Sequence, residues 1–194
     1  MEDQGKVVLI DPGIYSYNEK ALNISLLTQL DFIAITHEHS DHMHIPFIKD
    51  LLIKFPNARI IANNPVVNIL AKENISAVTE GNDYIKLEKA PHEKMFMGPS
   101  PENNLITCFG KISHPGDSLT FKTNSEILAL PITAPWGSTT WAVEKALELK
   151  PKVIIPIHDW HWKDEVRKGM YDRLEKYFKN NGIIFKKLEK KFFY

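Results

Sequence analysis

The chain has little of what marks several large classes of protein. Its one cysteine, Cys108, excludes an internal disulfide framework and is expected to be a small buried hydrophobe in an apolar strand. No run of about 18 apolar residues is present, so no membrane-spanning helix is expected. The first residues are acidic and no apolar segment of the signal-peptide type follows them, so we expect a cytoplasmic protein.

The chain also has no excess of charge of either sign. Lys and Arg together number 24, as do Asp and Glu, so the formal net charge is zero. Binding of nucleic acid by electrostatics is therefore not expected, and the basic run at residues 186–191 is interpreted as a solvated strand edge. The length of 194 residues, 43% of them hydrophobic, predicts a single domain over residues 1–194 with its own core.

Short apolar segments alternate along the chain with segments of helical periodicity. Strands are expected at residues 7–10, 32–35, 59–62, 84–87, 105–109, 126–131, 152–157 and 183–188. Helices are expected at residues 45–55, 65–72, 139–149 (with Ser138 as its N-cap) and 163–179. Residues 91–103 contain Pro, Gly and Ser without a clear period and are expected to form a loop. The alternation predicts a mixed α/β fold.

The most informative motif is the segment at residues 36–42, Thr-His-Glu-His-Ser-Asp-His, which directly follows an apolar strand. Imidazole nitrogens and carboxylate oxygens suit zinc and neighbouring first-row metals. His37 and His39 are two residues apart on extended chain and point to the same side, while Asp41 and His42 lie just beyond. Two pairs of ligands can therefore face two metals. A dinuclear site is favoured over a single structural zinc and over a solvated histidine-rich loop.

The spacing His37-x-His39-x-Asp41-His42 resembles the His-x-His-x-Asp-His signature of the metallo-β-lactamase superfamily of hydrolases. The pattern is most similar to the small predicted metal-dependent hydrolases related to L-ascorbate-6-phosphate lactonase. This resemblance implies an α/β (α+β) fold, the four-layer αβ/βα sandwich, with the metals where the strand-end loops meet. Members usually begin with two more strands, so a shortened N-terminal sheet, or an edge covered in a homo-oligomer, is expected here.

The resemblance also assigns residues outside the motif. Asp117, in a Gly-Asp-Ser element, is similar to the carboxylate that bridges the two metals, and His158 is similar to the last metal-binding histidine. The remaining ligand is His92 or His114; we prefer His92, with His114 then supporting the ligands from behind. Asp11, which closes an early strand, is similar to the acidic residue that supports the metal loop without binding metal.

The implied ligands form two sets that share Asp117: His37, His39 and His92 for one metal, and Asp41, His42 and His158 for the other. Two divalent ions are expected, zinc first, with manganese, nickel or iron as alternatives. A water between the ions would have its pKa lowered to about 7 and could attack as hydroxide. Asp41 and Asp117 are the predicted catalytic carboxylates, Asp41 also as proton acceptor or donor.

The substrate is expected to be a small molecule, with an ester or lactone favoured by the nearest resemblance. Trp136 is a candidate to line the pocket, and His161 is a candidate to touch substrate at its mouth. The alternatives are a phosphodiesterase or nuclease of the same superfamily, an iron-binding redox member, and a metal-binding protein without hydrolytic activity.

Overall fold

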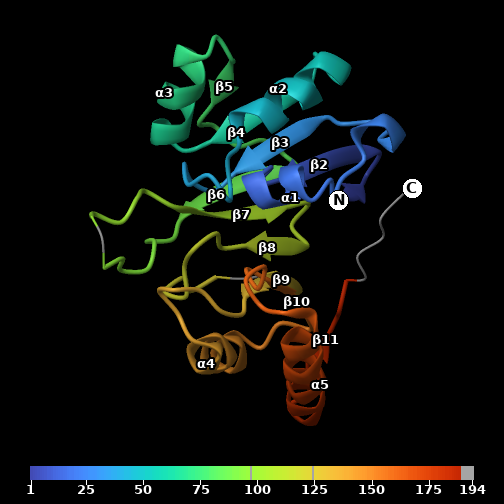
Figure 1. Ribbon diagram of the computed structural model, residues 1–194, viewed down its shortest axis with the longest axis vertical. Coiled ribbons are helices and arrows are strands. Elements are labelled where there is room, and N and C mark those ends of the chain that lie inside the picture. The colour runs from blue at the N-terminus through green and yellow to red at the C-terminus, as the bar shows by residue number, and fades with distance from the viewer. Residues whose placement is uncertain (97, 124, 189–194) are drawn as a thin grey trace.

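Two β-sheets pack face to face in this protein, and helices cover both outer faces (Figure 1). The computed structural model describes residues 1–96, 98–123 and 125–188. The first sheet has the strand order β1 (Glu2–Asp3), β2 (Lys6–Ile10), β3 (Phe32–Ile35), β4 (Arg59–Ala62) and β5 (Ala77–Val78). Strand β1 is antiparallel to β2, and the other neighbours in this sheet are parallel.

The second sheet has the strand order β11 (Ile184–Phe185), β10 (Val153–Ile157), β9 (Ile127–Pro131), β8 (Ile112–His114), β7 (Asn104–Cys108) and β6 (Ile85–Lys89). Strands β6, β7 and β8 pair antiparallel, whereas β8, β9, β10 and β11 are parallel neighbours. The helices are α1 (Ile14–Asn18), the 3-10 helix η1 (Ile24–Leu26), α2 (Ile45–Lys54), α3 (Asn64–Lys72), α4 (Thr139–Leu149) and α5 (Asp164–Asn180).

Three apolar cores separate the four layers. Alternation along β3 shows the division, because Ile33 and Ile35 pack with α2 and α3 while Phe32 and Ala34 face the second sheet. A third core joins the second sheet to α4 and α5. Figure 1 accordingly shows α2 and α3 at one end of the molecule and α4 and α5 at the other. The predicted αβ/βα sandwich is confirmed.

Local sequence explains where the helices begin. The Ser138 side chain accepts a hydrogen bond from the Trp141 backbone N–H at 3.3 Å, so it is the predicted N-cap of α4. The Asn63 side chain accepts from the Val66 N–H at 3.1 Å and caps α3, which has Pro65 in its first turn. None of the described helices combines the length and the apolar character that crossing a membrane requires.

The structure corrects several boundaries. The strand expected at residues 183–188 pairs only at Ile184–Phe185, and residues 189–191 of the basic run lie outside the described part of the chain. Strands β1, β5 and β8 and helix α1 were not expected, since elements of two to five residues are too short to show a period. Cys108 is buried between the sheets, where burial raises the pKa of its thiol to about 12, which confirms it as a core residue.

Candidate metal centre

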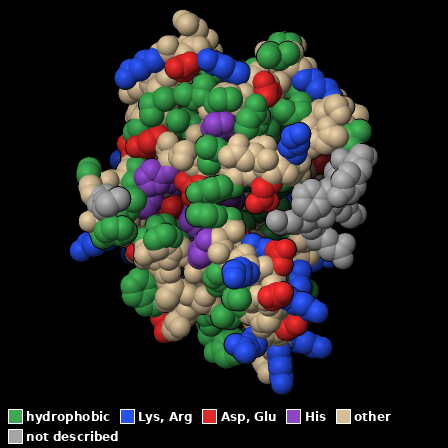
Figure 2. All heavy atoms as spheres, in the orientation of Figure 1, with side chains coloured by type: hydrophobic (Ala, Val, Ile, Leu, Met, Phe, Trp, Pro, Cys, Tyr) green, Lys and Arg blue, Asp and Glu red, His purple; other side chains and the backbone are tan. Residues whose placement is uncertain are grey.

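The candidate site lies where the carboxyl ends of strands from both sheets meet. Loops leaving these ends carry every residue that the sequence placed among the metal ligands: residues 37–42 follow β3, His92 follows β6, Asp117 follows β8 and His158 follows β10. Figure 2 shows histidine and acidic side chains gathered midway along this face of the molecule. Ligands commonly bind outside the carboxyl ends of strands in open α/β sheets.

The histidines and aspartates form two clusters. In the first cluster (His37, His39, His92 and Asp117) and in the second (Asp41, His42 and His158), one potential ligand atom per residue lies within 4.8 Å of the others. Within the first, His37 Nε2 lies 3.0 Å from His39 Nδ1. Within the second, Asp41 Oδ2 lies 3.7 Å from His42 Nε2 and 3.6 Å from His158 Nε2.

Asp117 lies between the two clusters and turns one oxygen to each. Its Oδ2 lies 3.3 Å from His92 Nε2 and 3.8 Å from His37 Nε2. Its Oδ1 lies 3.0 Å from the Nε2 atoms of both His42 and His158. This carboxylate therefore connects the two clusters, with one oxygen facing the imidazoles of each.

Hydrogen bonds at the outer ring nitrogens orient four of the imidazoles. His42 Nδ1 lies 2.7 Å from Asp11 Oδ2, and His92 Nδ1 lies 2.6 Å from the Glu93 carbonyl oxygen. His158 Nδ1 similarly lies 3.2 Å from the Thr133 carbonyl. His37 Nδ1 lies 3.0 Å from Thr36 Oγ1, which donates its own proton to Asp11. Since these partners accept hydrogen bonds, the Nδ1 atoms carry the protons and the Nε2 lone pairs face inward.

Four of the inward-facing atoms are buried acceptors without a hydrogen-bond partner among the described residues. His42 Nε2, His92 Nε2, His158 Nε2 and Asp117 Oδ1 are shielded from solvent, and the described part of the chain offers none of them a well-aligned hydrogen bond. Leaving such groups unsatisfied costs about 1–3 kcal/mol each. Imidazole and carboxylate ligands in this number fit divalent zinc or a neighbouring metal.

The electrostatics of the clusters favour a cation. Burial opposes ionisation of Asp117, but the imidazoles of His158, His42 and His92 hold the pKa of its carboxyl well below the usual range. Burial, together with the neighbouring His42, lowers the pKa of His37 to about 2, so this imidazole is neutral. Although burial opposes it, Asp11 and Asp117 raise the pKa of His42. The buried carboxylates thus attract positive charge to the inner nitrogens, and metal ions compete there with protons.

Asp11 contacts the segment at residues 36–42 through hydrogen bonds with Thr36 and His42, and it belongs to neither cluster. The resemblance predicted such a supporting position for it. Its Oδ1 accepts from the Thr36 backbone N–H at 2.8 Å, and its Oδ2 accepts from the Thr36 hydroxyl at 2.8 Å. Asp11 has a positive φ of 49°, which is uncommon for a residue with a side chain. The strand end is therefore held in an unusual conformation at the point where Asp11 reaches His42.

Two glycines allow the loops to approach one another closely. A Cβ at Gly13 would lie 1.7 Å from the Asp41 carbonyl oxygen, so only glycine fits against this backbone. At Gly116, with φ of 57°, a Cβ would lie 2.1 Å from Asn103 Oδ1. The close approach at Gly13 positions the backbone of Asp41, and the close approach at Gly116 positions the loop of Asp117.

Trp136 and Asn103 hold Asp117 in ways that the sequence did not indicate. The Trp136 indole Nε1–H donates to Asp117 Oδ2 at 2.9 Å, so this side chain contacts the carboxylate between the clusters besides lining a pocket. Buried Asn103 donates from Nδ2 to the carbonyls of Ala90 and Pro115 at 2.7 and 2.8 Å. It thereby joins the loop of His92 to the loop of Asp117. Neither residue belongs to a motif that spacing could identify.

The other candidate histidines lie outside both clusters. His114 Nδ1 accepts a hydrogen bond from the Gly116 N–H at 3.3 Å and lies 3.8 Å from Asp11 Oδ2, behind the ligands. His92, and not His114, therefore shares the first cluster. His161 is exposed and lies edge-on to Trp160 and Trp162, with ring centroids 5.4 and 6.3 Å away. Its predicted contact with substrate stays a prediction.

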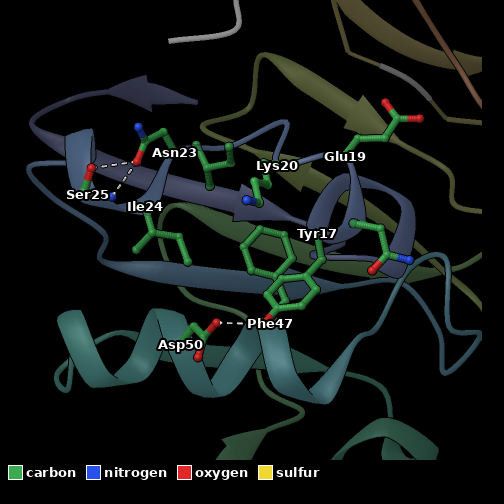
Figure 3. A pocket seen from close by; sticks show the side chains of 10 residues that line it. Tyr17, Glu19, Lys20, Asn23, Ile24, Ser25, Phe47 and Asp50 are labelled. Carbon is green, nitrogen blue, oxygen red and sulfur yellow. Dashed lines mark hydrogen bonds between the residues drawn. The ribbon is translucent and has the colours of Figure 1, made fainter. Parts of the chain in front are cut away.

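A cavity is also present away from the two clusters of histidines and aspartates. It has a volume of about 750 Å³ and lies between the segment that includes η1 and helix α2 (Figure 3). Tyr17 and Phe47 form its aromatic wall, and the Tyr17 hydroxyl donates to Asp50 at 2.9 Å. None of its lining residues belongs to either cluster. This cavity of about 750 Å³ is therefore separate from the candidate metal centre.

Comparison with known proteins agrees with this arrangement. A family model described as "Beta-lactamase superfamily domain" matches residues 1–158. The chain is 28% identical over 182 residues to a "UPF0173 metal-dependent hydrolase" of Thermococcus onnurineus, covering 81% of this chain and 79% of that protein. It is 27% identical over 180 residues to "Protein Rv0786c" of Mycobacterium tuberculosis, covering 86% and 82%.

Solved structures show the same fold. A crystal structure of a Parabacteroides distasonis protein matches with a TM-score of 0.69 and 22% identity, over 95% of this chain and 85% of that one. Isothiocyanate hydrolase from Delia radicum gut bacteria matches with a TM-score of 0.65 and 13% identity, over 98% and 92%. At these identities the likeness concerns the fold.

Proposed function

This chain belongs to the beta-lactamase superfamily, and from that premise we propose that it is a metal-dependent hydrolase with a dinuclear centre that cleaves ester or lactone bonds. One observation carries the proposal: the buried Asp117 carboxylate presents Oδ2 to His92 and Oδ1 to both His42 and His158. A similar protein of Thermococcus onnurineus is named a metal-dependent hydrolase, which supports the same reaction class.

The residues would divide between two ions as the clusters do. His37, His39 and His92 would hold one, Asp41, His42 and His158 the other, and Asp117 both. Two ions bound there would supply Lewis acidity and lower the pKa of a bound water to about 7. The outer hydrogen bonds of His42 and His92 aim their Nε2 atoms at the site, where a bound ion would take the place of a proton.

Asp41 is the best-placed proton carrier of the chain's own residues. Its side chain is 24% exposed, whereas the side chain of Asp117 is 3% exposed, so Asp41 can exchange a proton with solvent and Asp117 cannot. Its Oδ2 also lies within 3.7 Å of two imidazoles at the site. Asp41 would accept a proton during attack and return it to the leaving group.

The charges around the site support an uncharged carboxylic ester or lactone as substrate over an anionic phosphodiester. A cavity of about 220 Å³ opens beside Asp41, His42 and His158, and no Lys or Arg is found among the described residues that line it. Substrates with a permanent negative charge would lack a cationic partner there, apart from the ions themselves. Lys94 lines a separate cavity together with Trp136, where its charge could favour a phosphate.

The proposal is tested with zinc-loaded protein and three probes: γ-butyrolactone, phenyl acetate and bis(p-nitrophenyl) phosphate. We expect hydrolysis of the lactone or the ester, and loss of at least about tenfold of that activity in Asp117→Asn. Asp172→Asn, a change at an exposed residue of α5 outside both clusters, is the matched control and should keep activity. Hydrolysis of the phosphodiester alone would favour the phosphodiesterase alternative, and equal activity of Asp117→Asn would contradict the role of the carboxylate.

A further inference from the structure

Two large aromatic side chains meet at the mouth of the proposed metal centre. Tyr15 of α1 and Trp160, two residues beyond His158, stack with ring centroids 4.0 Å apart and an interplanar angle of 22°. Both remain substantially exposed, at 37% for Tyr15 and 44% for Trp160. Two exposed aromatic rings in contact form an apolar surface that the fold itself does not use.

This aromatic pair forms a wall of the cavity of about 220 Å³ already described. The same cavity is lined by Asp41, His42 and His158, so a group held against the pair would lie beside the second cluster. Cavities of about 150 Å³ with apolar walls bind benzene, so a phenyl-sized group fits this volume. Ile10 and Ile157 add aliphatic surface to the lining.

Hydrogen bonds fix the backbone segments that carry Tyr15 and Trp160. The Ile14 N–H donates to the Ser40 carbonyl at 2.8 Å, so the helix of Tyr15 is joined to the segment that contains His39 and Asp41. This attachment places Tyr15 in a fixed relation to the second cluster.

The loop of Trp160 is held from the other side by Arg167. Its guanidinium donates to Asp159 Oδ2 at 2.7 Å and to the carbonyls of Asp159 and Trp162 at 3.0 and 3.1 Å. The Tyr171 hydroxyl also donates to Asp159 Oδ2, at 2.6 Å. A ring held in place before binding contributes more to affinity, because less side-chain freedom is lost when the ligand binds.

The charges of the cavity define the chemistry of its occupant. Two of its three aspartates are engaged, Asp11 by His42 and Thr36, and Asp159 by Arg167 and Tyr171. Because no Lys or Arg is found among its described lining residues, an anionic group would gain no ion pair with such a side chain and could be attracted only by the bound ions. An uncharged group is the chemistry that fits.

We propose that the Tyr15–Trp160 pair is a specificity platform that selects substrates carrying an uncharged aromatic or similarly planar ring next to the scissile bond. This inference rests on the proposed hydrolase function, because it places the ring beside the cluster of Asp41, His42 and His158. It goes beyond that function by naming a substrate class and the residues that choose it.

The test compares phenyl acetate with ethyl acetate, two uncharged esters with the same acyl group. In Trp160→Ala and Tyr15→Ala, the ratio of kcat/KM for phenyl over ethyl acetate is expected to fall by about five- to tenfold relative to the unmodified protein. Trp160→Phe, which keeps a planar ring, should retain most of the preference. The matched control is Trp141→Ala, at a tryptophan that is 55% exposed on α4 and lines a different cavity, and it should leave the ratio unchanged.

A second measurement separates this proposal from the proposed function. Binding of acetophenone, an uncharged planar ketone that cannot be hydrolysed, is followed by saturation-transfer NMR on zinc-loaded and zinc-free protein. If neither the esters nor γ-butyrolactone are cleaved but acetophenone binds and Trp160→Ala abolishes binding, the hydrolase proposal fails and the platform stands. If esters are cleaved with an unchanged ratio in Trp160→Ala and Tyr15→Ala, or if acetophenone binds equally to the unmodified protein and Trp160→Ala, the platform is refuted.

Discussion

Replacement of Trp136 by phenylalanine is expected to weaken metal binding while leaving the fold intact. The indole Nε1–H donates to Asp117 Oδ2 at 2.9 Å, and Asp117 is 2% exposed, so water cannot readily replace the lost donor. Phenylalanine keeps an aromatic ring over the site but has no donor. The substitution therefore removes one interaction with the carboxylate that lies between the two clusters.

The size of the effect follows from that hydrogen bond. A hydrogen bond to a charged group contributes about 1.5–3 kcal/mol to stability, and each ~1.4 kcal/mol corresponds to a tenfold change in affinity. We expect the dissociation constant for zinc to rise by roughly 10- to 100-fold, the range found when groups that orient metal ligands are removed. Because Oδ2 is the oxygen nearest His92 and His37, the weaker binding step should be that of the first cluster.

The assay is a competition titration of zinc against a chromogenic chelator, which resolves successive binding steps. Trp141→Phe is the control, because Trp141 is exposed on α4 and belongs to neither cluster. Far-UV circular dichroism of both variants checks that the fold is kept. Two zinc-binding steps with unchanged affinity in Trp136→Phe would refute the positioning of Asp117 by the indole.

Three further predictions follow from single contacts. His92→Ala should lose zinc from the first cluster whereas His114→Ala should keep full zinc content by elemental analysis, and the reverse result would show that the wrong histidine was assigned. Hydrogen bonds from β2 lower the pKa of Asp31 although burial opposes them, so its contribution to stability is present above about pH 4 and is lost as the pH falls through the folded-state pKa. The difference in urea-unfolding free energy between the unmodified protein and Asp31→Asn should therefore shrink from pH 7 to pH 3, and a difference that stays constant would contradict this assignment. Gly13→Ala places a Cβ 1.7 Å from the Asp41 carbonyl oxygen, so unfolding free energy should fall by about 1–3 kcal/mol or more together with zinc content, and a variant with full stability and metal content would disprove the tight packing.

The parts of the site that are adjacent in the sequence were the predictable ones. Residues 36–42 carry members of both clusters on one turn after a strand, so their metal-binding chemistry can be predicted without knowledge of the fold. The choice between His92 and His114 could not be made from spacing. It depends on how the loop after β6 brings His92 to Asp117, whereas His114 ends strand β8 outside both clusters. Asn103, an ordinary residue in the sequence, joins the loop of His92 to the Asp117 loop.

In the fold, too, the features that depend on contacts between distant segments could not be predicted from the sequence. Alternating apolar segments predicted most strands of both sheets, because buried positions repeat along them. The two-residue strands β1 and β5 depend on pairing with a neighbour and have no local pattern. Contacts between distant segments, such as Trp136 with Asp117 and Tyr15 with Trp160, arise only when the strand ends converge.

A dinuclear metal centre would bind two metal ions per chain, so the number of bound ions is the decisive measurement. Protein purified without chelator or affinity histidines, and reconstituted where necessary, would be measured by elemental analysis beside Asp117→Ala. We expect about two divalent ions per chain and a lower content in the variant, with the fold largely intact. No retained metal after reconstitution, or full retention of both ions by Asp117→Ala, would contradict it.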